Sequence, residues 1–352
     1  MKMAFTFTRD DAKEAIKNNH SGNIIIPEGV TSIGASAFKD CKSLESIVIP
    51  KGVTDIGEDA FYGCKSLESI VIPEGVTDIG ASAFEGCSSL ESIVIPEGVT
   101  DIRHSAFALC RSLRSVIIPE SVVKIYDYAF YDCESLKTIV LPEGVTDIGH
   151  HAFGACISLT GIIIPDGVTK LNIDVFNRCS ALKSIVIPEG VTEIGAGAFE
   201  GCDSLKYINI PEGVTSIGDY VFKGCKSLKS IVIPGGDESH YKYGSSKGIQ
   251  HIGSRIFDQC CSLETVTLHC GSGCWLTPDM FGSNRGSLRS VRITHYSFKD
   301  AYTIENKENE YIICIPKSEL VNGSGSPSAS KVCNLFTDLC INLGIYMNKR
   351  EE

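Results

Sequence analysis

The chain has 352 residues, a formal net charge of −11 and an ordinary hydrophobic share of 43%. An acidic chain without a long basic run is a poor candidate for nucleic-acid binding, because phosphate contacts need clustered Lys and Arg. It is an equally poor candidate for electrostatic docking on an anionic membrane, and it has no apolar stretch of transmembrane length. We therefore expect neither a nucleic-acid partner nor membrane insertion.

Residues 1–22 predict an N-terminal cap. Phe alternates with polar residues at the start, and charged residues follow without an apolar core or a small-residue cleavage site. Thr8 and Asp11 stand in a capping-box-like arrangement at the start of a short helix, Thr8 to Asn19. The missing export signal indicates a cytoplasmic protein, with the cell surface or secretion as the alternative.

A 23-residue repeat dominates residues 23–299. Its strongest marker is a proline that recurs at every step of the repeat. These prolines are Pro27, Pro50, Pro73, Pro96, Pro119, Pro142, Pro165, Pro188, Pro211 and Pro234. A period in the twenties with aliphatic residues at fixed places predicts stacked coils, which bury their apolar faces only together.

The unit around Pro50 shows what each position does. Ile47 and Ile49 are spaced to point into a core, while Val48 between them points outward. Pro50 fixes φ and lacks an N–H donor, so it ends the strand pairing. The same strand recurs twelve times before residue 294, which predicts parallel strands about 4.8 Å apart.

The repeat resembles that of the BspA-like leucine-rich-repeat family, whose units read L-x-x-I-x-I-P-x-x-V-x-x-I-G-x-x-A-F-x-x-C-x-x-L. Residues 67–90 carry that phrase almost unaltered, and the resemblance covers roughly residues 24–293. It implies an α/β leucine-rich-repeat solenoid with a curved, parallel, concave sheet of about 12–13 strands and short helical or turn segments on the outer wall. It also implies a protein-binding or adhesive role, and members of the family are often displayed at cell surfaces.

The chain has sixteen cysteines, and ten of them occupy a single column of the repeat. A residue that recurs once per coil marks a structural position, and free Cys is readily buried. We therefore predict a ladder of buried thiols rather than serial disulfides. The column consists of Cys41, Cys64, Cys87, Cys110, Cys133, Cys156, Cys179, Cys202, Cys225 and Cys260.

Two segments depart from the repeat. An insertion at residues 235–247 leaves the coil just after a strand and predicts a surface loop, for which sequence drift and a binding role are the alternatives. Residues 300–352 predict a degenerate last strand, a flexible linker and a C-terminal helix, which either caps the stack or is offered to a partner or a second copy. The candidate binding residues of the loop are Asp237, His240, Tyr241 and Tyr243.

Stacking turns sequence columns into surface stripes. The outward strand column is almost entirely β-branched, which predicts an apolar stripe of the kind that usually marks a contact surface. Strand propensity alone also favours such residues. The predicted stripe is Val48, Val71, Val94, Ile117, Val140, Ile163, Val186 and Asn209.

The neighbouring column changes sign along the stack, so a partner could read its register from the charge. Inheritance from two duplicated blocks is the alternative. The acidic members are Glu45, Glu68 and Glu91, and the basic members are Arg114, Lys137, Lys183, Lys206 and Lys229.

The outer wall of the middle coils diverges most from the repeat. Exposed Tyr and Arg are typical of interface anchors. His104, Asp127 and His150 share a column, but nothing forces them to converge on a metal ion, so we prefer surface variation. The outer-wall candidates are Arg103, His104, Tyr126, Tyr128, Tyr131, His150 and His151.

A second group of metal-ligand residue types lies near the end of the repeat. It contains Cys260, Cys261, His269, Cys270 and Cys274. Zinc or a local disulfide stays open for these cysteines, although a terminal coil packed around a tryptophan is the preferred interpretation.

No phosphate loop, dinucleotide fingerprint or serine elbow is present. Acids and histidines stand at scattered repeat positions rather than around one nucleophile. The sequence therefore predicts a protein-binding solenoid that is not an enzyme and holds no cofactor or metal. A surface adhesin and a self-assembling structural protein, which would be a homo-oligomer, are the alternatives.

Overall fold

A computed structural model describes residues 5–18, 22–234, 249–270, 280–282, 290–295, 302–307 and 310–314. The chain divides into two compact units, Met1–Gly190 and Val191–Glu352, which are described one at a time. The predicted insertion loop, with its four candidate residues Asp237, His240, Tyr241 and Tyr243, lies outside the described residues. The predicted linker and C-terminal helix lie outside them as well.

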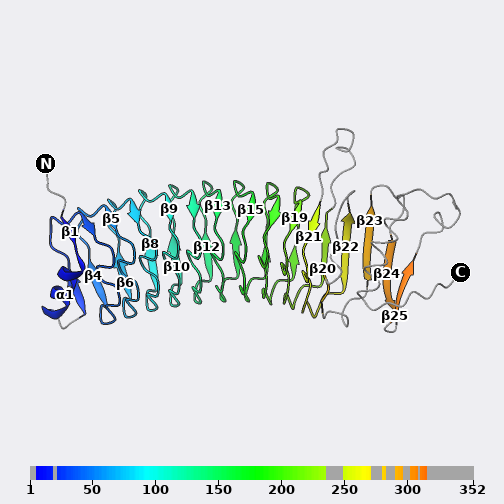
Figure 1. Cartoon of the computed structure of the whole chain (residues 1–352), viewed down its shortest axis with the longest axis horizontal. Helices are drawn as coiled ribbons and strands as arrows, with labels where there is room; N and C mark the ends of the chain where they lie inside the picture. The colour runs from blue at the N-terminus through cyan, green and yellow to red at the C-terminus, as the bar shows by residue number, and fades with distance from the viewer. Residues whose placement is uncertain are drawn as a thin grey trace. The chain divides into compact units, whose positions relative to one another are not determined.

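Each coil of the first unit contributes two short strands, one to each of two parallel ladders on separate walls (Figure 1). The main ladder contains the predicted strands. They are β2 (Asn23–Ile25), β4 (Ser46–Val48), β6 (Ser69–Val71), β8 (Ser92–Val94), β10 (Ser115–Ile117), β12 (Thr138–Val140), β14 (Gly161–Ile163) and β16 (Ser184–Ile185). In its register Ile24 lies opposite Ile47, and Ile47 lies opposite Ile70, so each coil repeats the last one.

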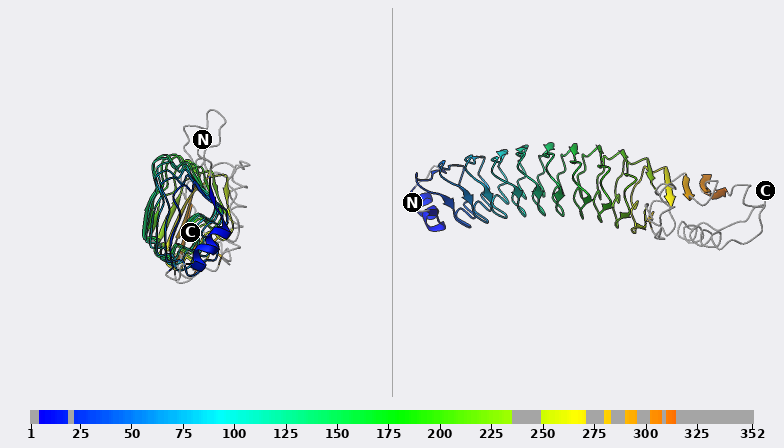
Figure 2. Two further views of the ribbon diagram at one scale, coloured as in Figure 1. Left: turned by 90° about the vertical axis from the view of Figure 1, so that its left-hand side faces the viewer. Right: turned by 90° about the horizontal axis from the view of Figure 1, so that it is seen from above.

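The second ladder was not predicted from the sequence. Its strands have only two residues each, which is too short for a period-two alternation to show. They are β1 (Thr6–Phe7), β3 (Ser32–Ile33), β5 (Asp55–Ile56), β7 (Asp78–Ile79), β9 (Asp101–Ile102), β11 (Lys124–Ile125), β13 (Asp147–Ile148) and β15 (Lys170–Leu171). Seen end-on, the coils of this unit lie one behind the next around the core (Figure 2).

A third wall, which we call the turn wall, is made of residues 34–41 and their equivalents in later coils. Its backbone alternates: Phe38 N–H donates to the Ala60 carbonyl of the next coil at 2.7 Å, whereas Lys39 N–H donates within the turn to Ser36 at 3.2 Å. This path needs left-handed backbone, and Ser36 and Asp40 have φ of 55° and 59°. Left-handed backbone costs free energy in a residue with a Cβ. The hydrogen bonds between coils must therefore stabilise it.

The core of the first unit is layered by the repeat. Phe7 and the Phe residue of each coil through Phe176 form a row of stacked rings with centroids 5.1 to 5.8 Å apart. Behind them the predicted ladder of buried free thiols is confirmed from Cys64 to Cys179. Each thiol donates to the carbonyl of the Phe in the preceding coil, for example Cys64 Sγ to Phe38 O at 3.1 Å. The Cys column thus supplies hydrogen-bond donors to the Phe carbonyls that are buried in the core.

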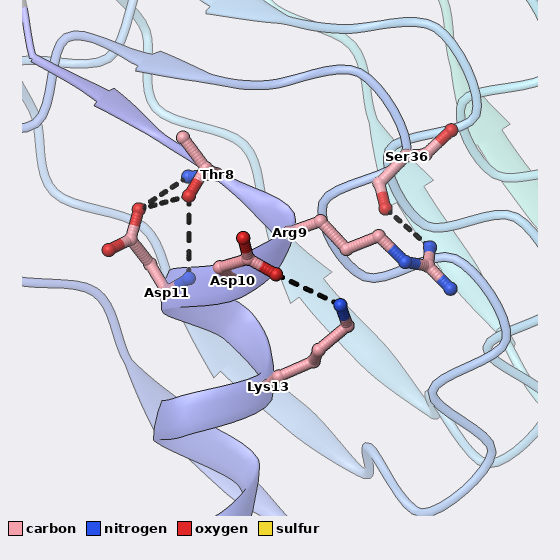
Figure 3. A network of polar contacts seen from close by, with 6 residues as sticks. All are labelled: Thr8, Arg9, Asp10, Asp11, Lys13 and Ser36. Carbon is pink, nitrogen blue, oxygen red and sulfur yellow. Dashed lines mark hydrogen bonds and ion pairs between the residues drawn. The ribbon is translucent and has the colours of Figure 1, made fainter.

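Helix α1 (Arg9–Asn18) lies at the start of the first unit, and Figure 3 shows the polar contacts of its first turn. The predicted capping arrangement is present: Thr8 N–H donates to Asp11 Oδ2 at 2.8 Å, and Asp11 N–H donates to Thr8 Oγ1 at 3.4 Å. The hydrogen bonds from the Thr8 hydroxyl and amide lower the pKa of Asp11. Arg9 Nη1 donates to Ser36 O at 2.8 Å, which joins the helix to the first turn wall. Among the described residues α1 is the sole α-helix, and no helix there is long and apolar enough to cross a membrane.

The second unit contains both kinds of ladder as well. Its main-ladder strands are β18 (Tyr207–Ile208), β20 (Ser230–Ile233), β22 (Thr265–Cys270) and β23 (Ser290–His295), and its second-ladder strands are β17 (Glu193–Ile194), β19 (Ser216–Ile217) and β21 (His251–Ile252). The insertion leaves the stack in register, because Ser216 still pairs with His251 and Phe222 still stacks on Phe257 at 6.0 Å.

The end of the second unit is a hairpin. β24 (Tyr302–Lys307) pairs antiparallel with β23, and β25 (Glu310–Cys314) pairs antiparallel with β24. The segment around Ile313, expected to be a degenerate last strand of the repeat, is β25, which runs in the same direction as β23 but is separated from it by the antiparallel strand β24. Two residues separate β24 from β25, and a connection that short permits a hairpin but no parallel crossover. The hairpin covers the edge that β23 would otherwise expose.

Candidate binding surface

The outward face of the main ladder in the first unit carries an unbroken row of β-branched aliphatic side chains. We call this row the apolar stripe. It consists of Ile25, Val48, Val71, Val94, Ile117, Val140, Ile163 and Val186. Their exposed fractions range from 57% at Val48 to 79% at Val71. The stripe follows from the strand alternation, since the residues on either side of each member point into the core.

The sequence prediction missed the first member of the stripe. Ile25 stands one period before Val48 and pairs with it directly in the parallel register. The prediction began the stripe one coil too late, although the same column position was readable from the spacing.

The last predicted member, Asn209, belongs to the second unit, where it and Lys206 are exposed. Tyr207 and Val232 are the large exposed side chains of the main ladder there. The eight-membered row of aliphatic side chains is therefore a property of the first unit alone.

One border of the stripe is the sign-changing column, which we call the mixed rim. Its members in the first unit are Glu45, Glu68, Glu91, Arg114, Lys137, the uncharged Thr160 and Lys183, and all seven are exposed. Where the sign changes, Arg114 Nη2 lies 3.9 Å from Glu91 Oε1. Both side chains are well exposed to water, so this contact contributes little to stability.

The other border is a column that sequence reasoning overlooked, although it is carried by the recurring Pro-Glu-Gly phrase. We call it the acidic rim. Its members are Glu28, Glu74, Glu97, Glu120, Glu143, Asp166 and Glu189, all exposed, and Lys51 is the one exception in this column of the first unit. Successive members are one coil apart, or about 4.8 Å along the ladder.

The outer-wall candidates form a partly packed cluster rather than an open surface. The Tyr128 ring stacks on His151 with centroids 4.6 Å apart, and it meets Tyr131 edge-on at 5.6 Å and His104 at 5.6 Å. His151 Nε2 lies 3.5 Å from Asp174 Oδ2. These side chains contact one another rather than solvent alone, so the cluster stabilises the turn wall.

The other three outer-wall candidates lie outside this cluster of rings. Arg103 Nε donates to Asp78 Oδ1 at 2.8 Å, and His150 Nδ1 accepts the Ile173 N–H at 3.2 Å. Tyr126 is exposed. The structure thus brings together four of the seven predicted residues and leaves three apart.

The column of His104, Asp127 and His150 does not converge. Asp127 Oδ1 accepts the backbone N–H of His150 at 2.7 Å, and the His104 ring lies against Tyr128. In the part of the chain that the structure describes, no group of three His, Cys, Asp or Glu could hold a metal ion.

The second candidate cysteine group loses one member to the core. Cys260 Sγ donates to Phe222 O at 3.0 Å, and burial raises the pKa of this thiol to about 12. This thiol is buried in the core and bonded to a backbone carbonyl there, so it is not placed to join a zinc site at the surface. Cys261 is an exposed free thiol. The side chain of Cys270 and all of Cys274 lie outside the described residues.

Comparisons with known proteins agree with this architecture. A family model for the BspA type leucine-rich repeat region, six copies long, matches residues 12–137 and 123–244. The structure is similar to a leucine-rich repeat protein from Bacteroides ovatus, with 27% identity and a TM-score of 0.55 over 78% of this chain and 82% of that one. It also resembles the pneumococcal vaccine antigen PcpA, with 19% identity and a TM-score of 0.51 over 77% and 84%.

A leucine-rich cell surface protein from Faecalibacterium prausnitzii is 28% identical over 79% of this chain and 88% of that one, with a TM-score of 0.47. No curated protein matches the chain. The expected leucine-rich-repeat solenoid is confirmed. The sequence predicted short helical or turn segments outside the main ladder, and in the described coils these are turns and a second ladder of short strands.

Proposed function

Since the chain belongs to the BspA-type leucine-rich-repeat family, we propose that it is a non-catalytic protein-binding solenoid whose contact surface is the apolar stripe. One observation carries the proposal: eight successive coils present an exposed Val or Ile on the same face. A contiguous exposed apolar patch on a soluble protein usually marks a contact surface. Leucine-rich-repeat solenoids are in general non-catalytic, which agrees with this role.

The side-chain types suit a contact surface. Val and Ile are stiff at χ1 and lose little rotamer freedom on burial. Covering a largely exposed Val or Ile contributes roughly 1–1.5 kcal/mol, so the whole row contributes on the order of 10 kcal/mol. Association itself costs about 4–15 kcal/mol. The stripe can therefore drive a complex, but the charged rims must supply much of the remaining affinity and the choice of partner.

The test compares partner capture by three purified forms of the full chain. The first is the unaltered chain, and the second carries Val94→Lys, Val140→Lys and Val186→Lys. The third is a matched control with Val123→Lys, Ile157→Lys and Ile173→Lys, which are exposed aliphatic positions away from the stripe. Circular dichroism first establishes that all three fold.

We expect one specific partner from source-cell extract to be captured by the unaltered chain and the control but lost with the stripe variant. Retention of the same partner by the stripe variant would refute the proposal. The 235–247 loop and the outer wall would then be the leading surfaces.

A second candidate, self-assembly, is favoured by the mixed rim. In a two-fold contact between antiparallel copies, the acidic end of one mixed rim would lie against the basic end of the other, so the charges would be complementary. The same arrangement would oppose two acidic rims, so we rank it below binding to another protein. Light scattering over a range of concentrations decides: a constant monomer mass rules out self-assembly.

Surface display, which the family resemblance implies, would keep the same contact surface and change only the compartment. Labelling intact source cells with a membrane-impermeant reagent separates the two locations. A labelled chain is a surface adhesin, and an unlabelled chain is cytoplasmic.

A further inference from the structure

We propose that the occupant of the apolar stripe is a cationic amphipathic α-helix that lies along the stack of coils of the first unit. Its apolar face would cover the stripe, and its Lys and Arg side chains would reach the acidic carboxylates at the borders. This inference rests on the proposed function, because it takes the stripe to be the contact surface.

The spacing of the stripe suits a helix better than an extended peptide. Successive stripe residues are one coil apart, or about 4.8 Å. A helix returns to the same face every 5.4 Å, whereas an extended strand does so only every ~6.7 Å. The seven intervals from Ile25 to Val186 span about 34 Å, the length of a helix of about 22 residues.

The width between the two rims also suits a helix. Glu45 precedes Val48 by three residues and Lys51 follows it by three, so each rim lies no more than ~10 Å from the stripe. A helix with its side chains is about 10–12 Å across. One that sits on the stripe would hold its flanking side chains above both rims, within reach of long Lys and Arg side chains.

The charge of the rims indicates a basic partner. Seven of the eight positions of the acidic rim in the first unit are Asp or Glu. Among the described residues the carboxylates of Glu74, Glu97, Glu120 and Glu143 make no hydrogen bond or ion pair. Neighbouring like charges repel at this spacing, so a cation that lies between them is favourable. The free carboxylates are therefore available to a partner.

The mixed rim gives the helix a direction. Over the first coils Glu45, Glu68 and Glu91 add a second acidic border, so a basic helix meets carboxylates on both sides there. From Arg114 onward that border is basic, and only the acidic rim attracts the helix. The end of the helix with basic residues on both flanks is thus expected over the N-terminal coils, because the opposite orientation places like charges together.

The probe is a fluorescein-labelled peptide of about 22 residues, made of Leu and Lys with all Leu on one helical face. A scrambled peptide of the same composition and a Leu/Glu peptide with the same pattern are the ligand controls. Fluorescence anisotropy with the full chain measures affinity, and circular dichroism follows helix formation on binding. We expect the two control peptides to bind at least about tenfold more weakly than the probe.

Two protein variants and a matched control locate the site. The set Val94→Lys, Val140→Lys and Val186→Lys removes the apolar contact, and the set Glu74→Lys, Glu97→Lys and Glu120→Lys reverses part of the acidic rim. The control set is Asp55→Lys, Asp101→Lys and Asp147→Lys, which makes the same change in net charge on the second ladder. We expect each test set to weaken the probe at least about tenfold and the control set to change it by less than about threefold.

Equal binding of the scrambled peptide, or equal effects of the two sets of acidic substitutions, would show a diffuse electrostatic attraction and overturn the proposal. Failure of the probe to bind, while the stripe variant still loses its cellular partner, would overturn the helical occupant and leave the proposed function intact. A dimer of the unaltered chain that the stripe variant dissociates would assign the stripe to a second copy and likewise overturn the proposal.

Discussion

Two faces of the first unit are both exposed and both built from repeated columns, yet they differ in what their side chains touch. The apolar stripe is uniform, and it is bordered by the exposed charged side chains of the mixed rim and the acidic rim. The turn wall is varied in sequence, and its side chains pair with one another, as Tyr128 does with His151 and His151 with Asp174. The side chains of the turn wall gain their contacts from one another and stabilise the fold. The apolar side chains of the stripe lack such contacts and are available to a partner.

The largest expected effect concerns the thiols behind the turn wall. Burial raises the pKa of Cys110 and Cys156 to about 12, well above the range of an exposed thiol. Such groups stabilise the folded state fully below the pKa of the unfolded thiol, and they lose that contribution as the pH rises toward the folded value. From pH 8 to 10 each thiol is expected to remove about 1.4 kcal/mol, or about 3 kcal/mol for the pair.

Urea unfolding at pH 8, 9 and 10 measures this loss. The double variant Cys110→Ala and Cys156→Ala should lose less stability between pH 9 and 10 than the unaltered chain. Identical slopes for the two proteins would contradict the proposed coupling between burial and ionisation. The stripe variant is the control, and its free energy of unfolding should change with pH as steeply as that of the unaltered chain.

An intermediate effect is expected from a pair of glycine substitutions, one on each face. A Cβ added at Gly149, beside the turn wall, would lie 2.4 Å from Asp127 N and 2.6 Å from Tyr126 C. Those atoms are backbone and cannot move aside cheaply, so Gly149→Ala should destabilise the chain by about 1–3 kcal/mol. A Cβ at Gly161, in β14 of the main ladder, meets nothing within 4 Å.

Gly161→Ala is therefore the matched control and should leave stability unchanged or raise it by up to about 1 kcal/mol. Thermal or urea unfolding of the two variants gives the comparison directly. Equal destabilisation would mean that the turn wall is no more tightly packed than the sheet face.

The smallest expected effect is the coupling within the outer-wall cluster. A double-mutant cycle with Tyr128→Ala and His151→Ala should give an interaction energy of about 0.5–1.5 kcal/mol, since the two rings stack with an interplanar angle of 9°. The same variants should keep the partner that the stripe binds. An interaction energy of zero would mean that the rings are independent and the cluster is not a brace.

Much of the fold follows from the sequence because the same residue types recur at the same positions of every repeat. The spacing of Ile47 and Ile49 predicts the main ladder, and the Cys column predicts buried thiols, because each position has one environment in every coil. Two-residue strands such as Asp55–Ile56 leave no periodic signal, so the second ladder was missed. The antiparallel strand β24 was missed too, because Tyr302–Lys307 does not carry the strand phrase of the repeat.

The candidate surface was predictable in outline and incomplete in detail. The outward column was read correctly from period-two alternation but was begun at Val48 instead of Ile25. The acidic rim was overlooked because its Glu residues lie in a turn phrase, where acids are ordinary. The packing of Tyr128 against His151 was not predictable, because it needs residues 23 apart in sequence to meet across two coils.

The most direct test of the account measures binding and stability on the same two variants. One carries Val94→Lys, Val140→Lys and Val186→Lys, and the other carries Val123→Lys, Ile157→Lys and Ile173→Lys. Both should unfold within about 1 kcal/mol of the unaltered chain, because exposed substitutions change stability little. We predict that only the first variant loses its partner. Loss of the partner by both variants, or by neither, would contradict the claim that the apolar stripe is the contact surface.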